Sequence, residues 1–514
     1  MTRHVVDLDR LTAAAVREGA LDGRSVTVLG LARSGVAMAR FFVDAGARLT
    51  VYDGRSEAEL GAAIEALAGR AVELRLGPDV EPSTAWAEAD LIATSPSITP
   101  DFPTAEPRLR AALAAVVAAH RADPAGAPAL VSETDLVLRM CPCPTIGVTG
   151  TKGKTTTSSL AAALLAADPA HPVVLGGNIG VPLVERLTDL TAEHRVVIEL
   201  SELQIPTLSR GTTVAVYTNV TADHLDRHGS LEAYRKVKRR LAELVDPSGA
   251  LVLNADDPVV AGYASGARAP VITYRLGEPA EFGVGVRDGW IVADGAIGRG
   301  RQTPTPVTFE VMPVGELAIP GRHNVANAMA AISVAIYFGI PYEAIRRAAA
   351  AFTGVEHRLE QVALIDRVRF VNDSQGTQPD AVIAALRSFP RPLILIAGGR
   401  DKGVDLSGLG PVAADRADAA ILIGESGPTL AEMFRERGMT RVELSASLEG
   451  AVARADEIAR GLLAEAGGEG PATVLLSPAA ASFDMFVDYA ARGHAFKAAV
   501  ADLRQRRRAV ESKR

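Results

Sequence analysis

The sequence predicts an α/β protein of three domains, and three observations support this fold class. The chain has 514 residues, which suits about three domains of roughly 100 to 200 residues each. Apolar strand-like segments alternate with helical segments in three successive blocks, a pattern typical of mainly parallel sheets covered by helices. In the middle block, a loop rich in glycine, lysine and threonine joins a strand to a helix. We place the domains at residues 1–131, 132–354 and 355–514, with Rossmann-like first and third domains.

The composition narrows the class of protein. No apolar run approaches the roughly 18 uncharged residues of a membrane span, and the N-terminal MTRHVVDLDRL lacks the apolar core of a signal peptide. The formal charge of −7 argues against nucleic acid as the main partner. The only cysteines, Cys141 and Cys143, have a spacing that suits neither a disulfide nor a zinc site. We therefore expect a cytoplasmic protein.

The first block opens with strand, glycine turn, helix and strand over residues 24–54. In doubly wound sheets, ligands bind at the carboxyl ends of such strands. The turn has Ala32 at the second glycine position of a dinucleotide fingerprint, and its methyl group would obstruct a pyrophosphate, so NAD is only weakly indicated. Asp53 ends the second strand, where it either binds a ribose or is a plain strand-end carboxylate. Ser97 lies in a further loop at the same edge.

The middle block contains a phosphate-binding loop in VTGTKGKTTTSSL, residues 148–160. Its glycines, Gly150 and Gly153, let backbone N–H groups approach phosphate oxygens, and the helix that follows adds the positive end of its dipole. Lys154 would reach the outer phosphates, and the Thr155 hydroxyl could bind Mg²⁺. The loop is tighter than a standard P-loop, whose first glycine would stand at Val148. The alternative is a turn that binds nothing, but we predict a domain of the P-loop ATPase type.

Titratable side chains follow two further strands of this block. Glu199 ends an apolar strand, where a charge needs a partner such as the metal of a nucleotide, and Glu202 competes for that role three residues later. A second strand is expected over Val214 to His228, and its last part carries Asp223, His224, Asp226 and His228. Magnesium bound by carboxylates and an imidazole is favoured over zinc, for which no third ligand is evident, and an exposed polar turn is the alternative.

The helix expected from Leu231 to about Val245 carries five basic residues, and one of them lies on its apolar side. Lys238 follows Tyr234 by four residues and precedes Leu241 by three, so it shares the apolar stripe. Such a lysine commonly extends its amine to solvent. Near bound cations an ammonium is disfavoured, and an unusual state becomes possible.

The remaining segments complete the three-block pattern. Residues 280–320 predict a small antiparallel excursion from the central sheet. From about Val355 the strands VRFVND, PLILIAGG, AAILIG and ATVLLSP alternate with helices. They predict a second doubly wound domain.

Ten motifs along the chain resemble, in order and spacing, those of the Mur ligase family: GTKGKTT, GGNIG, IELSELQ, NVTADHLDRH, YRKVK, GRHNVANAMAA, GVEHRLE, NDS, AGGRDKG and SPAAASFDMF. The resemblance covers nearly the whole chain, and it implies an ATP-dependent ligase that joins an acid to an amino acid. It is strongest with the members that add D-glutamate to UDP-N-acetylmuramoyl-L-alanine in peptidoglycan synthesis. In these enzymes ATP converts the carboxylate to an acyl phosphate, which the glutamate amine attacks.

The resemblance also implies roles for individual residues. The implied ATP-binding set is Gly150, Thr151, Lys152, Gly153, Lys154, Thr155, Thr156, Asn324, Asn327, Arg358 and Asp373. The implied catalytic and metal set, with two Mg²⁺ ions, is Lys154, Thr155, Glu199, His224 and Lys238, the last as a carbamylated lysine. The implied UDP-sugar set is Ala32, Arg33, Ser34, Asp53, Arg55, Ser97 and Asn178, and the amino-acid set is Thr377, Lys402, Ser482, Phe483 and Tyr489. A monomer is expected.

The chain departs from the family pattern at three places. Gln375, Gly376 and Gln378 stand where the D-glutamate-adding members usually have Lys, Ala and Asn, Glu202-Leu203 replaces Ser-Phe, and Ser97 replaces a glycine. The identity and stereochemistry of the added amino acid therefore stay open.

Several alternative functions remain. The nearest are an L-glutamate-adding variant, a neighbouring Mur ligase and a folylpolyglutamate synthase. A regulatory protein that uses the phosphate loop as a switch would leave the motifs around Lys402 and Ser482 unexplained. A dinucleotide oxidoreductase would need the glycine that Ala32 replaces.

Overall fold

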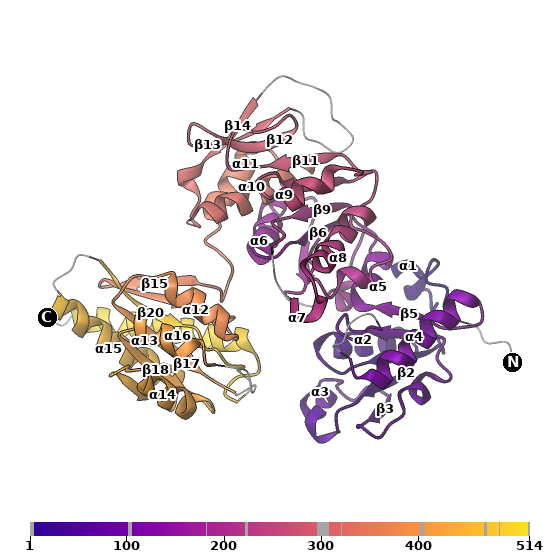
Figure 1. Ribbon diagram of the computed structural model, residues 1–514, viewed down its shortest axis with the longest axis horizontal. Helices are drawn as coiled ribbons and strands as arrows, with labels where there is room; N and C mark the ends of the chain where they lie inside the picture. Colours follow the sequence, from indigo (N-terminus) through magenta and orange to yellow (C-terminus); the bar gives the residue numbers. More distant parts are fainter. Residues whose placement is uncertain are drawn as a thin grey trace. The chain divides into compact units, whose positions relative to one another are not determined.

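The structure is a computed structural model that describes residues 5–100, 105–180, 182–221, 225–295, 308–319, 321–400, 406–466, 470–482 and 484–511. It contains three sheets with mainly parallel strands (Figure 1), which confirms the predicted α/β class with three parts. The chain forms two compact units, Met1–Phe352, which holds two of the sheets, and Thr353–Arg514, which holds the third. Among the described residues, no helix has the length and apolar character needed to cross a membrane.

The first sheet has five parallel strands in the order β3-β2-β1-β4-β5. The strands are β1 (Ser25–Leu29), β2 (Arg48–Asp53), β3 (Val72–Leu76), β4 (Leu91–Thr94) and β5 (Ala129–Ser132), and the helices are α1 (Ala13–Arg17), α2 (Arg33–Asp44), α3 (Gly61–Glu65) and α4 (Pro107–Ala122). The strand order reverses between β1 and β4. In doubly wound sheets this reversal opens a ligand crevice at the carboxyl ends of the strands.

The central sheet has nine strands in the order β14-β13-β12-β11-β10-β9-β6-β8-β7. They are β6 (Thr145–Thr149), β7 (Val173–Gly177), β8 (Arg195–Glu199), β9 (Val214–Tyr217), β10 (Ala250–Asn254), β11 (Val271–Tyr274), β12 (Gly283–Arg287), β13 (Trp290–Asp294) and β14 (Thr308–Pro313). The last three pair antiparallel with one another, which confirms the antiparallel excursion. All other pairs in this sheet are parallel.

Helices on the two faces of the central sheet complete the first unit. They are α5 (Glu133–Met140), α6 (Lys154–Leu165), α7 (Leu225–His228), α8 (Leu231–Leu244), α9 (Pro258–Ala261), α10 (Arg322–Tyr337) and α11 (Tyr342–Ala351). The helices α6 and α10 pack together over one hydrophobic core. A second core is continuous from the strands of the first sheet to the other face of the central sheet, so the two sheets share apolar contacts.

The strand expected over Val214 to His228 was too long, because β9 ends at Tyr217 and α7 occupies Leu225–His228. The polar residues after Tyr217 turn back to the neighbouring loop instead of extending the strand. Thr218 Oγ1 donates to the Lys152 carbonyl (2.6 Å), and Asn219 Nδ2 donates to the same oxygen (2.9 Å).

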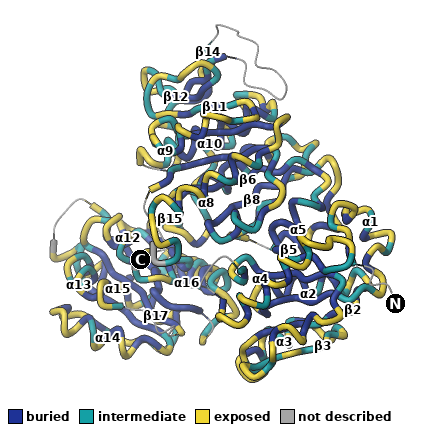
Figure 2. The backbone as a smooth tube through the Cα atoms, turned by 45° about the vertical axis from the view of Figure 1, so that its right-hand side comes forward, coloured by how far each residue is buried: buried dark blue, intermediate teal, exposed yellow. Residues whose placement is uncertain are grey.

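The second unit has a six-stranded sheet in the order β15-β16-β20-β17-β18-β19. Its strands are β15 (Glu360–Ile365), β16 (Val368–Asn372), β17 (Leu393–Gly398), β18 (Ala419–Ile423), β19 (Val442–Leu444) and β20 (Ala472–Leu476), and its helices are α12 (Pro379–Arg387), α13 (Leu409–Arg416), α14 (Gly427–Glu436), α15 (Leu448–Ala466) and α16 (Tyr489–Glu511). Two strands were not predicted from the sequence: β15, which is antiparallel to β16, and the short β19. Figure 2 shows the strands as buried layers between more exposed helices.

Candidate active site

The predicted phosphate loop lies at the carboxyl end of β6, and both of its glycines are required by the backbone. Gly150 has φ +146° and Gly153 has φ +86°, a region in which residues with a Cβ are strained. A Cβ on Gly150 would lie 1.9 Å from Thr218 Oγ1, and one on Gly153 would lie 2.4 Å from Asn327 Oδ1. The loop is therefore packed closely against side chains of two other segments.

Lys154 folds its amine over this loop. Its Nζ donates to the carbonyls of Gly150 (3.1 Å) and Thr151 (2.9 Å). The backbone N–H of Lys152 donates to Asn219 Oδ1 (2.9 Å), which fixes the other side of the loop. The amine thus lies where a phosphate held at the N-terminus of α6 would meet it.

Two asparagines of the GRHNVAN motif lie beside the first turns of α6. Thr157 Oγ1 donates to Asn327 Oδ1 (3.3 Å), and Asn327 Nδ2 donates to Asn324 Oδ1 (3.2 Å). Although the two segments are far apart in sequence, packing of α10 on α6 brings them together. Asn327 thus lies against Gly153 and Thr157 and is hydrogen-bonded to Asn324.

Glu199 lies next to the phosphate loop because β8 pairs with β6, with Glu199 opposite Val148. The side chain is buried, and its Oε1 accepts a hydrogen bond from Asn178 Nδ2 (2.9 Å). Its Oε2 is also buried and has no hydrogen-bond partner among the described residues. A buried carboxylate oxygen without a donor is costly, so this atom suits a cation such as Mg²⁺.

Lys238 lies on the apolar side of α8 and is fully buried. Its Nζ donates to Thr149 Oγ1 (3.1 Å) and lies 5.6 Å from the centre of the Tyr234 ring. Thr149 is the last residue of β6. The amine therefore does not extend to solvent but lies at the same strand edge as the phosphate loop and Glu199.

Glu202, the competing carboxylate, is committed to an ion pair. Its Oε1 lies 3.2 Å from Arg227 Nη1 on α7. The same region holds His228, whose ring packs edge-on against Tyr234 at 5.3 Å between centroids. The predicted metal ligand His224 and its neighbour Asp223 lie outside the described residues.

The predicted UDP-sugar residues lie at the carboxyl edge of the first sheet. The Asp53 carboxylate accepts hydrogen bonds from the N–H of Leu31 (2.8 Å) and from the Arg55 side chain (2.7 Å). Burial alone would raise the pKa of Asp53, but these donors hold it below its usual value. Asp53 therefore organises the loops after β1 and β2.

Arg33 connects this edge to the central sheet. Its guanidinium donates to the carbonyls of Gly180 (3.1 Å) and Gly177 (3.4 Å) in the GGNIG loop, which also carries Asn178. Ala32 is the N-cap of α2, with Ser34 in its first turn. Ser97 Oγ lies 3.1 Å from Ser95 Oγ in the loop after β4. The structure thus brings the first-domain loops next to Asn178 and Glu199.

In the second unit, Asp373 follows β16 and is buried. Ser477 Oγ donates to its Oδ2 (2.6 Å) and the Leu359 N–H donates to its Oδ1 (3.2 Å). Burial raises the pKa of Asp373 to about 6. A Cβ on Gly376 would lie 2.4 Å from Asp373 Oδ2 and 2.6 Å from Ser477 Oγ. A side chain at position 376 would therefore displace the Asp373 carboxylate or the Ser477 hydroxyl.

The other predicted residues of this unit lie around the same edge of the sheet. Arg358 precedes β15, Thr377 follows Gly376, Ser482 is buried after β20, and Tyr489 begins α16. Lys402 and Phe483 lie outside the described residues.

Three residues that organise these sites were not predicted from the sequence. Asn219 binds the phosphate loop and Thr149 binds Lys238. The only sequence signal for them is their position: Asn219 begins the motif NVTADHLDRH, and Thr149 directly precedes GTKGKTT. Arg492 is buried in α16 and contacts the loops after β16 and β20. A single arginine in a helix has no local signal that distinguishes it from a solvent-exposed one.

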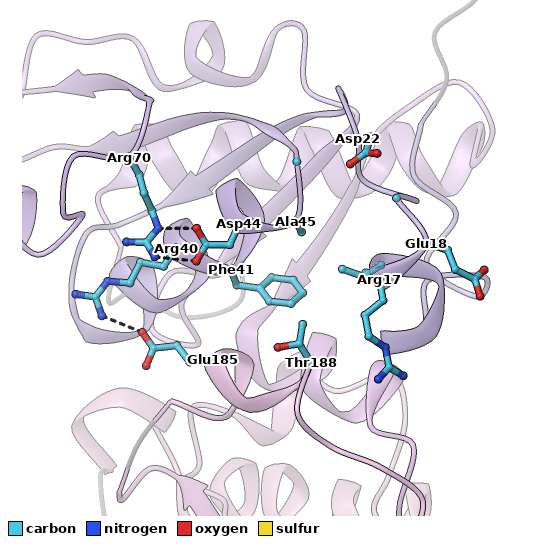
Figure 3. A pocket seen from close by; sticks show the side chains of 13 residues that line it. Arg17, Glu18, Asp22, Arg40, Phe41, Asp44, Ala45, Arg70, Glu185 and Thr188 are labelled. Carbon is cyan, nitrogen blue, oxygen red and sulfur yellow. Dashed lines mark hydrogen bonds and ion pairs between the residues drawn. The ribbon is translucent and has the colours of Figure 1, made fainter.

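A cavity of about 840 Å³ lies elsewhere, at the C-terminal end of α2. Figure 3 shows its charged side chains facing one another, with Arg70 against Asp44 and Arg40 against Glu185. This end of α2 leads to the amino end of β2, opposite the ligand-binding edge expected for a parallel sheet. The cavity is therefore separate from the candidate active site.

Family comparisons agree with this geometry. The Mur ligase MurD-like N-terminal domain matches residues 24–120, the Mur ligase middle domain matches residues 148–335, and the Mur ligase glutamate ligase domain matches residues 357–480.

Relatives match over nearly the full length. The UDP-N-acetylmuramoylalanine–D-glutamate ligase of Symbiobacterium thermophilum is 38% identical over 477 residues, covering 92% of this chain and 97% of the relative. The enzyme of the same name from Anaeromyxobacter dehalogenans is 38% identical over 488 residues, covering 93% and 97%. A crystal structure of MurF from Acinetobacter baumannii, 14% identical, has a TM-score of 0.52 and covers 96% of this chain and 98% of its own, a likeness of fold. The chain belongs to the Mur ligase family and is an ATP-dependent ligase.

Proposed function

We propose that this ligase adds D-glutamate to UDP-N-acetylmuramoyl-L-alanine in the synthesis of peptidoglycan precursors. The proposed reaction is supported most strongly by one observation: the phosphate loop, the Glu199 carboxylate and the buried Lys238 amine lie together at the ends of β6 and β8. The names and full-length similarity of the relatives support the substrate pair. The cytoplasm, where such precursors are made, is the proposed compartment.

The proposed reaction begins with activation of a carboxylate, which is a poor electrophile. Transfer of the γ-phosphoryl group of ATP to the carboxylate gives an acyl phosphate and ADP. The glutamate amine attacks the acyl carbon, the C–N bond forms, the amine loses a proton, and phosphate leaves. Lys154 binds the outer phosphate oxygens and stabilises the charge that develops during transfer.

Two Mg²⁺ ions, when bound, would neutralise charge on the phosphoryl oxygens. Thr155, Glu199 and His224 are the proposed ligands, together with Lys238 after carbamylation. In carbamylation the ammonium first loses a proton, and the neutral amine then forms a C–N bond to carbon dioxide with loss of a second proton, so a cation becomes an anionic oxygen ligand. The complete burial of Lys238 supports this state, because an ammonium is disfavoured in such surroundings. Asn178 orients Glu199 through their hydrogen bond.

Substrate binding is divided among the sheet edges. We assign UDP-sugar binding to Ala32, Arg33, Ser34, Asp53, Arg55, Ser97 and Asn178. We assign ATP to residues 150–156 with Asn324, Asn327, Arg358 and Asp373, and the amino acid to Thr377, Lys402, Ser482, Phe483 and Tyr489.

The test is phosphate release from ATP with Mg²⁺, UDP-N-acetylmuramoyl-L-alanine and either enantiomer of glutamate. Release that requires both the nucleotide sugar and D-glutamate supports the proposal. Release that requires L-glutamate instead would indicate that the departures from the family pattern at Glu202 and Gln375 change the choice of amino acid. Release without the nucleotide sugar would refute UDP-N-acetylmuramoyl-L-alanine as the acceptor.

A matched pair of variants tests the metal-binding assignment. Glu199→Gln keeps the shape of the side chain but removes its charge, and it should abolish turnover and weaken Mg²⁺ binding. Glu193→Gln makes the same change in an exposed residue beyond η3 (Leu183–Arg186) and should leave both unchanged. Equal activity of the two variants would exclude Glu199 as a metal ligand.

A further inference from the structure

Arg492 lies in the first turn of α16 and is 1% exposed. It sits beneath the loops that follow three adjacent strands, in the sheet order β16-β20-β17. Parallel sheets bind ligands at these carboxyl ends. Two of the loops carry the proposed amino-acid residues Thr377 and Ser482, so Arg492 connects the segments from which that site is built.

The guanidinium of Arg492 donates to both of these loops. Nε donates to Ser374 Oγ (3.0 Å) and Nη2 to the Ser374 carbonyl (3.0 Å), in the loop after β16. In the loop after β20, Nη1 donates to the carbonyl of Ala481 (3.1 Å) and Nη2 to that of Ala480 (3.2 Å). Ser374 Oγ in turn donates to the Tyr489 carbonyl (2.7 Å). The planar fork thus fixes the distance between the loops.

The loop after β17 is held by the same group of atoms. The Arg400 N–H donates to the Ala481 carbonyl (2.9 Å), and the Ala481 N–H donates to the Arg400 carbonyl (3.2 Å). A Cβ on Gly399 would lie 2.2 Å from the Ala481 oxygen and 3.1 Å from Arg492 Nη1. A side chain at Gly399 would therefore push the third loop away from Arg492.

The bonds to Arg492 also orient a backbone donor. In a trans peptide the N–H points opposite to the C=O. Because the Ala481 carbonyl points at Arg492, the N–H of Ser482 points away from it. A displaced carbonyl would turn this N–H and the Ser482 side chain together.

Arg492 is a buried cation, and Asp484 is the acidic residue whose charge acts on it and favours its protonated form. Burial lowers the pKa of Arg492 to about 10, so it stays protonated at neutral pH. A charge in such low-dielectric surroundings acts over a longer distance than one in water. It favours an anionic ligand at the adjacent loops.

We propose that Arg492 is a positioning residue that fixes the amino-acid-binding loops of the second unit and adds positive potential for the carboxylates of the bound amino acid. This inference rests on the proposed function. It adds a residue that does not touch the substrate but sets the affinity for it.

Arg492→Lys tests the role of the fork, because lysine keeps the charge but lacks the planar donors. We expect the KM for glutamate to rise about tenfold, as for lost hydrogen bonds to a charged group, with the KM for ATP changed by less than about twofold. Arg492→Met also removes the charge and should raise the KM for glutamate further. Ser374→Ala is a milder variant that removes one acceptor of Arg492 and the donor to the Tyr489 carbonyl. It should raise the same KM by about threefold even if the Arg492 variants fail to fold.

Arg507→Lys is the matched control on the same helix. Arg507 is largely buried and pairs with Asp456 and Asp366, away from the three loops. This variant should lower the melting temperature without raising the KM for glutamate. If Arg492→Lys and Ser374→Ala lower only the melting temperature, as Arg507→Lys does, or raise the KM for ATP and glutamate equally, the positioning role is wrong.

The wild-type assay separates this inference from the proposed function. If no form of glutamate supports phosphate release, the proposed substrate is wrong, and the variants are then compared with the amino acid that does support release. A selective rise in the KM for that amino acid supports the role of Arg492, and an unchanged KM refutes it.

Discussion

Substitution of Gly153 by alanine should weaken both the fold and the binding of ATP. The left-handed conformation of Gly153 (φ +86°) costs a residue with a Cβ about 1–2 kcal/mol. The added Cβ would also lie 2.4 Å from Asn327 Oδ1, so the amide must move and lose its bond to Thr157, worth about 1 kcal/mol. We therefore expect a total loss of about 2–3 kcal/mol in the free energy of unfolding.

Gly289→Ala provides a matched control in the same unit. Gly289 has φ +79° in the turn between β12 and β13, but among the described residues no atom beyond its chain neighbours lies within 4 Å of the position that a Cβ would take. Its substitution should cost only the backbone contribution. The difference between the two variants in urea unfolding therefore isolates the contact between Gly153 and Asn327.

The effect on the nucleotide follows from the same displacement. Gly153 is the N-cap of α6, and its rotation would redirect the N–H groups that face a phosphate. A loss of about 1.4 kcal/mol would weaken ATP binding about tenfold, measurable by calorimetry. The reasoning is refuted if Gly153→Ala destabilises the protein no more than Gly289→Ala does and binds ATP as tightly as wild type.

Three further predictions follow from contacts elsewhere. Arg33→Ala removes two hydrogen bonds to the GGNIG loop and should raise the KM for the nucleotide sugar about three- to tenfold, with the KM for glutamate unchanged. A KM for the nucleotide sugar equal to that of the wild type would contradict the role of this contact. Burial raises the pKa of Asp373 from 3.8 to about 6. The protonated carboxyl therefore makes its full contribution to the free energy of unfolding below about pH 4, and this contribution is lost as the pH rises through about 6. Relative to wild type, Asp373→Asn should therefore gain about 2 kcal/mol in the free energy of unfolding between about pH 4 and pH 7, and urea titrations that show a constant difference would exclude the shift. The hydrogen bond from the Cys143 thiol lowers the pKa of Cys141, whereas that bond and burial raise the pKa of Cys143. Iodoacetamide should therefore modify Cys141 first, and Cys143→Ala should slow the modification of Cys141. Peptide mass spectrometry measures both rates.

The local sequence determined the glycine-containing loop before α6 and the position of Lys238 on the apolar side of α8. Glycines before Lys154 allow one compact turn, and helical spacing places Lys238 on the same side as Tyr234 and Leu241. Both results depend only on neighbouring residues. The alternation of strands and helices likewise determined three mainly parallel sheets, because each segment carries its own periodicity.

Only the tertiary structure decided which distant residues meet. Glu199 and Glu202 are both acidic residues near a strand end, but the pairing of β8 with β6 places Glu199 beside the phosphate loop, while Arg227 pairs with Glu202. The role of Arg492 likewise depends on three strands that are adjacent in the sheet but separate in sequence. Spacing along the chain determines which side of an element a residue occupies, whereas the order of strands in the sheet determines what that side faces.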